Sequence, residues 1–331
     1  MAGPVDDIRS FLEESVRDFS GYELLDGDAS ARLYYRVFAE GRTYVLCRDA
    51  AFIGVPVPDY PFAVVHELIR DHVPVPEIIR RDSRRGLLLL EDLGDELLEY
   101  AFPRLDRDSI VSIYEGCIEN MLSIQRIRGE GAAPFSLEFD TDKLMFEFNF
   151  FIEHALHGYF GAPTAPAELR DLSSEFLKIA RILDRRDLFV LNHRDYHSRN
   201  IILHDGRSYI IDFQDARMGL PQYDAVSLLR DSYVRLDPDI FSYLKNYCYE
   251  GGRDMGVHAM GKDDFNYFFD IMAFQRNIKA LGTFGYQVSA RGNVRYEKYI
   301  RPTAAYLGDY AARRDELSKA WRILSAHLSA H

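Results

Sequence analysis

The residues best suited to chemistry lie in the segment 193–200, which reads His-Arg-Asp-Tyr-His-Ser-Arg-Asn, and at Asp212, which follows an apolar pair. The spacing H-x-D-x-x-x-x-N, followed by D-F, is typical of phosphoryl-transfer sites. It places the carboxylate of Asp195 where a hydroxyl proton must go, and the side-chain oxygens of Asn200 and Asp212 where a metal must bind. The sequence therefore predicts a base beside a metal site.

The chain between Asn200 and Asp212 predicts a β-hairpin. Two apolar runs flank Asp205-Gly206, a pair typical of a two-residue type I′ turn because both central positions need positive φ. In that register Asn200 falls opposite Ile211, so Asn200 and Asp212 come together at the open end of the hairpin. Adjacent oxygen ligands on a rigid element suit Mg²⁺, which completes its coordination with water and phosphate oxygens.

The same residue types also have structural uses. A histidine such as His193 can pack inside a loop, and Asp195 and Asn200 can serve as turn or cap residues. The predicted hairpin and the correctly spaced Asp212 favour the functional interpretation, because few chance matches to a motif also satisfy its structural context.

Composition narrows the class of protein without identifying it. The 331 residues allow one large or two ordinary domains, and the formal net charge of −12 argues against non-specific nucleic-acid binding, which needs a basic surface. Cys47, Cys117 and Cys248 lie far apart and form no C-x-x-C pair, which argues against a zinc site and suits a reducing compartment. The sequence shows no secretory signal and no apolar run long enough to span a membrane. We therefore expect a cytoplasmic protein with no nucleic-acid or membrane partner.

Periodicity predicts an α+β fold with two lobes, residues 1–93 and 94–331. In the first lobe the patterns indicate helices at 6–19 and 62–71 and antiparallel strands at 22–25, 34–38, 43–47, 77–79 and 86–90. In the second lobe they indicate helices at 109–126, 142–156, 167–185, 223–233, 238–250, 263–282 and 296–324. A small sheet-rich lobe joined to a larger helical lobe is the arrangement of protein kinases, in which a nucleotide binds in the cleft between the lobes.

The segment 192–229 resembles the aminoglycoside phosphotransferase and choline kinase superfamily, above all in Asp-Phe-Gln-Asp at 212–215 and Gly-Leu-Pro-Gln-Tyr-Asp at 219–224. Further segments are similar to the branch that contains the anomeric kinases of N-acetylmuramate and N-acetylglucosamine in bacterial cell-wall recycling. They read Asp-Ala-Ser at 28–30, Val-Pro-Val-Pro at 73–76, Leu-Leu-Leu-Glu-Asp-Leu-Gly at 88–94 and Gln-Arg-Asn-Ile-Lys-Ala-Leu-Gly at 275–282. The resemblance spans most of the chain.

This resemblance implies a protein-kinase-like fold, ATP as the phosphoryl donor, Mg²⁺ as the cofactor and a small hydroxyl-bearing molecule as the acceptor. It implies Asp195 as the catalytic base, Asn200 and Asp212 as Mg²⁺ ligands, and His193 and Asp224 as residues that shape the catalytic loop from behind. It also implies that Glu91 to Leu93 form the hinge whose backbone binds the adenine edge; an ordinary strand end rich in acidic residues is the other interpretation.

The phosphate-binding residues depart from the usual kinase pattern. Such kinases place a lysine on the third strand of the small lobe, but this chain has no lysine before Lys143. Four arginines, at positions 32, 36, 42 and 48, could supply the charge instead, and we prefer Arg36 and Arg48 because each falls on or at the end of a predicted strand. The glycine-rich loop is also replaced by a segment in which the Ser30 hydroxyl can bind phosphate oxygens. All four arginines could equally be solvated residues at the strand edges.

The acceptor is the least constrained part of the prediction. The branch resemblance favours an amino sugar phosphorylated at its anomeric hydroxyl, whose acidity reduces the need for a strong base. Aminoglycosides and choline-like amines are the rivals. Gln275, Arg276 and Lys279 could reach the acceptor from one helix, or could pair only on its surface. A nucleotide-binding pseudokinase scaffold remains the alternative of another class, supported by the missing lysine and opposed by the complete set of Asp195, Asn200 and Asp212.

Overall fold

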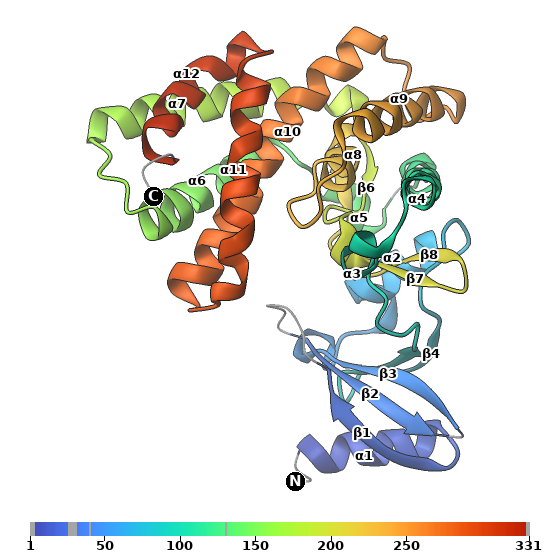
Figure 1. Cartoon of the computed structure of the whole chain (residues 1–331). Helices are drawn as coiled ribbons and strands as arrows, with labels where there is room; N and C mark the ends of the chain where they lie inside the picture. Colours follow the sequence, from blue (N-terminus) through green and yellow to red (C-terminus); the bar gives the residue numbers. More distant parts are fainter. Residues whose placement is uncertain (1–3, 26–31, 40, 130, 329–331) are drawn as a thin grey trace. The chain divides into compact units, whose positions relative to one another are not determined.

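The computed structural model describes residues 4–25, 32–39, 41–129 and 131–328, and the chain forms two compact units (Figure 1). The first unit contains residues 1–96 and 201–214, and the second contains residues 97–200 and 215–331. Residues 201–214 are thus grouped with the N-terminal part of the chain, and the predicted boundary after residue 93 stays a prediction.

The first unit is built on a five-stranded antiparallel sheet of order β1-β2-β3-β5-β4. Its strands are β1 Phe19–Leu24, β2 Leu33–Ala39, β3 Arg42–Arg48, β4 Ile78–Asp82 and β5 Leu87–Glu91. Helix α1, Pro4–Ser15, lies against one face of the sheet, where Phe11 and Leu12 are fully buried with Val37 and Leu46 (Figure 1). Helix α2, Pro61–Ile69, follows β3 in the chain. All the elements predicted for this part of the chain are present, with ends displaced by a few residues.

The predicted hairpin is confirmed. Strand β7, Ile201–His204, pairs antiparallel with β8, Arg207–Ile210, and His204 lies opposite Arg207 as the turn requires. Asp205 has a φ of 47° and Gly206 a φ of 71°, so both central residues adopt the left-handed conformation of a type I′ turn. A local signal of two residues therefore sets the register of the strand that leads to Asp212.

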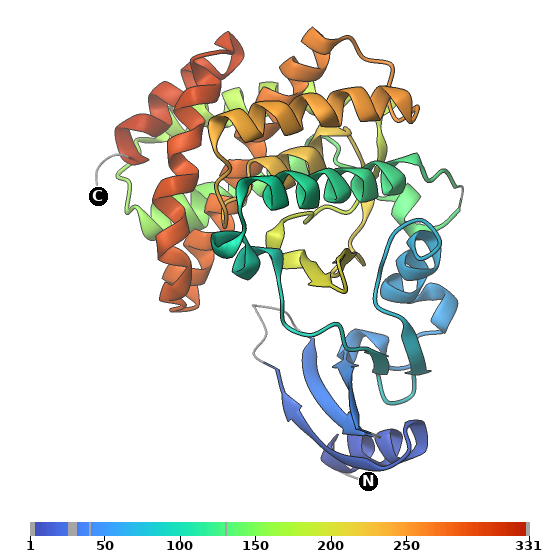
Figure 2. The same cartoon turned by 45° about the vertical axis from the view of Figure 1, so that its right-hand side comes forward.

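The second unit is mostly helical (Figure 2). Its helices are α3 Leu98–Ala101, α4 Arg107–Arg126, α5 Ala133–Ser136, α6 Thr141–Phe151, α7 Pro166–Leu183, α8 Gln222–Leu229, α9 Pro238–Asp254, α10 Lys262–Gly285, α11 Glu297–Ala311 and α12 Asp315–Leu328. Two short strands, β6 Val190–Asn192 and β9 Arg217–Gly219, pair antiparallel. They bring together the two ends of the segment 193–216, which contains Asp195, Asn200 and Asp212.

Helix α10 is the central element of this unit and contacts α6, α8 and α11. It is buried on most of its surface and carries Asp270, Gln275, Arg276 and Asn277 among its buried residues. Buried polar groups are costly unless they are paired, so a helix of this composition specifies its neighbours through hydrogen bonds as well as packing.

One predicted helix is wrong in extent. The pattern at 296–324 predicts a single helix, but the chain turns at residues 312–314 and forms two helices, α11 and α12. The turn lets α12 fold back against α11 and α7, where Leu317, Ala320 and Leu324 are fully buried. Because the turn contains neither glycine nor proline, the sequence gives no local sign of it.

Candidate active site

The loop that carries Asp195 begins where β6 ends, and a buried carboxylate fixes its first residues. Asp224, in the first turn of α8, accepts hydrogen bonds from the backbone N–H groups of His193 at 2.6 Å and Arg194 at 3.0 Å. Burial raises the pKa of Asp224 to about 7, whereas the two N–H groups favour its charged form. Arg194 has a φ of 86°, a left-handed conformation that is strained in any residue but glycine. Asp224 therefore holds a strained backbone directly before Asp195.

His193 lies on the inner side of this loop. Its side chain is buried, and its Nδ1 accepts a hydrogen bond from the backbone N–H of Asp195 at 3.3 Å. The structure thus places both residues that were predicted to support the loop, His193 and Asp224, against its backbone.

Asp195 is surrounded by three cationic side chains. Lys279 Nζ donates a hydrogen bond to Asp195 Oδ1 at 2.6 Å, and Arg276 Nη2 lies 3.6 Å from the same oxygen. Arg194 Nε lies 3.7 Å from Asp195 Oδ2. Burial favours the protonated carboxyl, but the three cations outweigh it and hold the pKa of Asp195 well below its usual range. The carboxylate is therefore charged at neutral pH and is a weak base.

The cations around Asp195 are themselves anchored. Arg276 Nε donates to Ser227 Oγ at 2.9 Å, and Arg194 Nη1 lies 2.9 Å from Asp215 Oδ2. Gln275, next to Arg276, is fully buried and donates to Glu147 Oε2 at 2.8 Å. These contacts fix the side chains within the unit, and the predicted contact of Gln275 and Arg276 with an acceptor stays a prediction.

Asn200 ends the loop in a short 3₁₀ turn, Ser198–Asn200. Its side-chain N–H₂ donates to the backbone oxygen of Asp195 at 2.9 Å, so the orientation of its amide is set and its oxygen is the atom left for a cation. The backbone N–H of Ser198 donates to buried Asp231 at 2.9 Å. Burial raises the pKa of this carboxyl to about 6. Two buried carboxylates, at positions 224 and 231, thus hold the two ends of the loop.

Asp212 belongs to the first unit and follows the hairpin. Its φ is 63°, which is unusual for a residue other than glycine, and its side chain is 46% exposed. Gln214 donates to Asp212 Oδ1 at 2.8 Å, and the ring of the buried Phe213 packs 4.9 Å from that of Phe62 on α2. The neighbouring aromatic contact anchors the segment and leaves the carboxylate accessible.

Arg32 contacts both Asp212 and Asp49, a buried carboxylate that also binds Tyr60. Arg32 Nε donates to Asp49 Oδ2 at 2.8 Å, and its Nη1 lies 3.8 Å from Asp212 Oδ1. Tyr60 also donates to Asp49 Oδ2, at 2.7 Å. Burial opposes ionisation of Asp49, but the hydrogen bonds from Tyr60 and Arg32 hold its pKa below the usual value. An arginine is therefore held beside Asp212 by a second carboxylate.

The residues predicted to bind the nucleotide have different surroundings. Arg36 is engaged by two carboxylates, with hydrogen bonds of 2.8 Å to Asp92 Oδ2 and to both oxygens of Asp95. Arg48 ends β3 opposite Leu33, and Ser30 lies outside the described residues. Arg36 would have to leave both carboxylates to bind phosphate, whereas Arg32 already lies beside Asp212.

Glu91 and Leu93, the predicted hinge, lie at the end of β5. The backbone N–H of Glu91 donates to Glu77 at 2.9 Å, and the side chain of Leu93 is buried. Within the described part of the chain, the backbone N–H and C=O of Leu93 take part in no hydrogen bond. Both groups are therefore available to the edge of a planar ligand.

The contacts of Lys279 and Arg32 were not predicted from the sequence. The sequence indicates Lys279 only as an acceptor contact or a surface pair. Its spacing of three residues from Arg276 puts both on one helix face, which is a signal that the two could share one partner. Arg32 was one of four candidate arginines, and no local pattern distinguishes it from the others. Only the fold pairs it with Asp49.

Comparisons with known proteins agree on the class of molecule. A model of the phosphotransferase enzyme family matches residues 21–260. The N-acetylmuramate/N-acetylglucosamine kinase of Neisseria meningitidis serogroup B is 28% identical over 305 residues, which cover 90% of this chain and 87% of the relative.

Two solved structures show the same fold. The complex of the phosphotransferase APH(2″)-IIa with streptomycin and ATP has a TM-score of 0.62 at 13% identity, covering 90% of this chain and 97% of that one. Choline kinase LicA from Streptococcus pneumoniae has a TM-score of 0.55 at 16% identity, covering 88% and 95%. At these identities the likeness concerns the fold alone, and it confirms the predicted protein-kinase-like α+β class. None of the helices in the described residues is long and apolar enough to cross a membrane.

Proposed function

The chain belongs to the phosphotransferase enzyme family and is a small-molecule kinase, and we propose that it transfers the γ-phosphoryl group of ATP to the anomeric hydroxyl of an N-acetylated amino sugar. The resemblance seen in the sequence is thereby confirmed at the level of the family. ATP, Mg²⁺, the acceptor, the cytoplasmic location and the roles of individual residues belong to the proposal.

The observation that carries the choice of acceptor is the environment of Asp195. Its carboxylate accepts a hydrogen bond from Lys279 at 2.6 Å and has two further cations within 4 Å, so it is a weak base. A weak base suits a hydroxyl that gives up its proton easily, and a hemiacetal hydroxyl is more acidic than an ordinary alcohol. In the proposal Asp195 orients this hydroxyl and accepts its proton as the phosphoryl group is transferred.

The relative from Neisseria supports the same choice. Its name specifies N-acetylmuramate and N-acetylglucosamine, and its alignment with this chain extends well beyond the catalytic loop. The relative from Pseudomonas aeruginosa carries the same name and is 28% identical over 96% of this chain. The solved structures concern aminoglycosides and choline, but at lower identity they support the fold and not the acceptor.

Mg²⁺ would be held by the amide oxygen of Asn200 and the carboxylate of Asp212. The amide nitrogen of Asn200 is already used within the loop, and the side chain of Asp212 is 46% exposed, so each offers the hard oxygen that Mg²⁺ prefers. When bound, Mg²⁺ supplies positive charge that neutralises phosphate oxygens. The described residues form no cluster of three or more His, Cys, Asp or Glu side chains fit to bind a metal, but Mg²⁺ takes most of its ligands from water and phosphate.

Arg32 is the proposed cation for the phosphates, in the role that a lysine has in other kinases. Asp49 and Tyr60 fix its guanidinium from one side, and Asp212 lies 3.8 Å from its Nη1. In protein kinases a lysine paired with a glutamate lies near a metal-binding aspartate. Here Arg32 paired with Asp49 would take the place of that lysine and glutamate. Guanidinium stays charged and can bind phosphate through two N–H groups, so the exchange is chemically sound.

The unused backbone groups of Leu93 support the proposed hinge for adenine. A base edge that offers one donor and one acceptor would satisfy both groups, which otherwise must be hydrated. The buried side chain of Leu93 anchors this backbone from the other side. All three free thiols, Cys47, Cys117 and Cys248, are buried, which suits the proposed cytoplasmic location.

The proposal is tested by coupled assay of ADP release with N-acetylglucosamine and N-acetylmuramate. The matched control is the methyl glycoside of N-acetylglucosamine, in which only the anomeric hydroxyl is blocked. We expect turnover with both free sugars and none with the glycoside. Turnover with the glycoside would contradict the choice of hydroxyl, and turnover only with aminoglycosides or choline would contradict the choice of acceptor. Nucleotide binding without turnover on any acceptor would support the scaffold alternative instead.

A further inference from the structure

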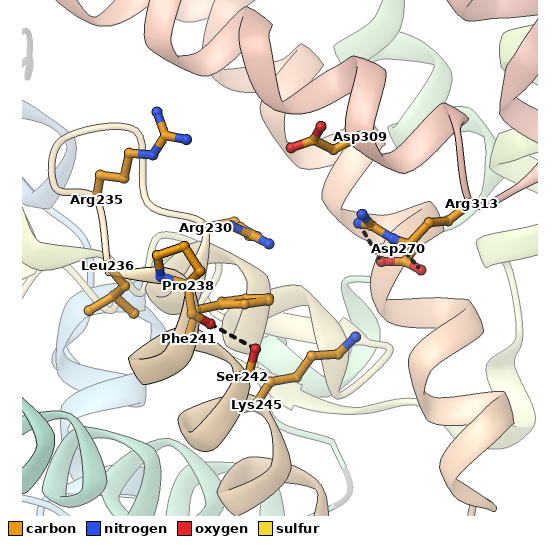
Figure 3. A pocket seen from close by; sticks show the side chains of 10 residues that line it. All are labelled: Arg230, Arg235, Leu236, Pro238, Phe241, Ser242, Lys245, Asp270, Asp309 and Arg313. Atoms are coloured by element: carbon orange, nitrogen blue, oxygen red, sulfur yellow. Dashed lines mark hydrogen bonds and ion pairs between the residues drawn. The ribbon is translucent and has the colours of Figure 1, made fainter.

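A cavity of about 440 Å³ lies in the second unit, lined by residues of α9, α10 and α11 and of the segment before α9 (Figure 3). Its lining contains Arg230, Arg235, Lys245 and Arg313 as cations and Asp270 and Asp309 as acids, an excess of two positive charges in a chain whose net charge is −12. Cavities of this size hold small organic ligands.

Some of the charged side chains in this cavity form ion pairs and others do not. Asp270 is already matched, because Arg313 Nη2 lies 3.1 Å from its Oδ1 and Arg314 Nη2 lies 2.9 Å from its Oδ2. Among the residues that the structure describes, no carboxylate lies within 4 Å of the charged groups of Arg230, Arg235 or Lys245. Among the described residues, three cations therefore line the cavity without a direct ion pair to a carboxylate.

Arg230 is held ready for a ligand. Its guanidinium lies 3.5 Å from the ring centre of Phe241 and 5.1 Å from that of Tyr306, so aromatic faces fix its plane. Its Nε is buried and has no hydrogen-bond partner among the described residues. A buried donor without a partner is costly, which is why such groups mark places where a ligand or water completes the structure.

Arg235 and Lys245 add to the same charge. The guanidinium of Arg235 lies 5.4 Å from the ring centre of Tyr306, the ring that Arg230 also contacts. The pKa of Lys245 is lowered to about 8, chiefly by burial; Asp270 raises it, and Arg313, Arg230 and Arg314 lower it. Like charges brought together in this way repel one another unless an anion lies between them.

The other polar groups limit the kind of anion. Asp309 borders the cavity, and Figure 3 shows its carboxylate and the side chains of Arg230 and Lys245 directed toward the space between them. Ser242 also lines it and donates to the backbone oxygen of Pro238 at 2.7 Å, which leaves its own oxygen as an acceptor. A carboxylate and a hydroxyl oxygen accept hydrogen bonds from ligand hydroxyls, whereas the cations bind phosphate.

We propose that this cavity binds a phosphate monoester of a small polyhydroxylated molecule, with its phosphate on Arg230, Arg235 and Lys245 and its hydroxyls on Asp309 and Ser242. None of its lining residues is among those that surround Asp195, and the proposal does not depend on the proposed phosphoryl acceptor.

The test is calorimetric titration of the full chain with glucose 6-phosphate, with glucose and inorganic phosphate as the two partial probes. We expect glucose 6-phosphate to bind, glucose not to bind, and inorganic phosphate to bind at least about 10-fold more weakly, because it lacks the hydroxyls. Absence of glucose 6-phosphate binding at millimolar concentration would overturn the site. Equal binding of inorganic phosphate would overturn the part assigned to Asp309 and Ser242.

Variants locate the binding within the molecule. Arg235→Gln combined with Lys245→Gln should weaken the binding of glucose 6-phosphate by about 10-fold or more. Arg235 is exposed and Lys245 is half-buried, and glutamine keeps much of the length of both side chains, so the variant should fold. Arg291→Gln, which removes an exposed arginine elsewhere in the unit, should change nothing. Arg32→Gln, in the proposed nucleotide site, should also leave this binding unchanged. Loss of binding in Arg32→Gln with retention in the double variant would place the phosphate at the nucleotide site and overturn the proposal.

Discussion

The two carboxylates at the centre of the proposed chemistry, Asp195 and Asp212, have opposite environments. Asp195 lies among three cations that suppress its basicity, and its loop is tied to buried Asp224 and Asp231. Asp212 is 46% exposed and has one arginine at 3.8 Å. One carboxylate is surrounded by protein cations, whereas the other is half-exposed to solvent.

This difference supports a separate proposed role for each carboxylate. A carboxylate held by Lys279 can orient a hydroxyl without binding a metal strongly, since the lysine already occupies one of its oxygens. The half-exposed carboxylate of Asp212 lies on a left-handed backbone, a kind of strain that is common at functional sites, which supports the proposed metal-binding role.

The largest expected effect comes from removing the charge of Asp195. Asp195→Asn should lower kcat by about 10²–10⁴-fold, the usual worth of a positioned base, and leave the affinity for nucleotide nearly intact. Steady-state kinetics and calorimetric titration with ADP measure the two effects. Near-normal turnover in this variant would remove Asp195 from its proposed role.

Asp212→Asn should lower turnover by about 10²–10³-fold, comparable to the loss of one electrostatic group at a reacting centre. Because Asp212 is half-exposed, the melting temperature should stay close to that of the wild type. A raised requirement for Mg²⁺ in an activity titration is the diagnostic readout. A large drop in melting temperature with an unchanged Mg²⁺ requirement would make Asp212 a structural residue.

Lys279→Met should change the pH profile of turnover. The pKa of Asp195 is depressed in the folded chain. The charged carboxylate therefore stabilises the fold above its unfolded pKa, near ~3.9, and this stabilisation is lost as the pH falls through the folded pKa. Without the lysine the folded pKa rises, and the acidic limb of the profile should move to higher pH. Lys279→Arg, which keeps the charge, should restore the wild-type limb. An unchanged limb in Lys279→Met would show that the lysine does not set the basicity of Asp195.

The smallest effect compares two arginines of the first unit. Arg32→Gln should lower the affinity for ATP by roughly 10-fold, which is the contribution of one or two charge-assisted hydrogen bonds. It should lower the affinity for adenosine much less, because adenosine has no phosphate. Arg36→Gln is the matched control, since it removes a guanidinium that two carboxylates already occupy. It should lower the melting temperature and leave ATP affinity nearly unchanged. The reverse outcome would favour the assignment made from the sequence, which prefers Arg36 and Arg48.

Local signals account for what the sequence predicted well. The Asp205-Gly206 turn depends on two adjacent residues, and hydrophobic periodicity over ten or more residues located most helices. The spacing from His193 to Asn200 likewise lies within one loop, so the motif can be read from neighbours in the chain, although distant Asp224 and Asp231 hold the loop in place. Such features need no knowledge of how distant segments meet.

Long-range pairing accounts for what the sequence did not predict. Lys279 meets Asp195 only because α10 passes the catalytic loop, and periodicity predicts a helix without saying which residue its face will meet. The choice of Arg32 over Arg36 depends on the partners of each, Asp49 for one and Asp92 with Asp95 for the other. The turn that separates α11 from α12 depends on burial against α7, which no local residue indicates.

The most direct test of the central claim is phosphorus NMR of the product formed from N-acetylglucosamine and ATP. We predict a phosphate monoester whose phosphorus is coupled to the anomeric proton, because the weak base at Asp195 suits the acidic anomeric hydroxyl. A phosphorus signal coupled instead to the protons of the primary hydroxymethyl group would contradict the account.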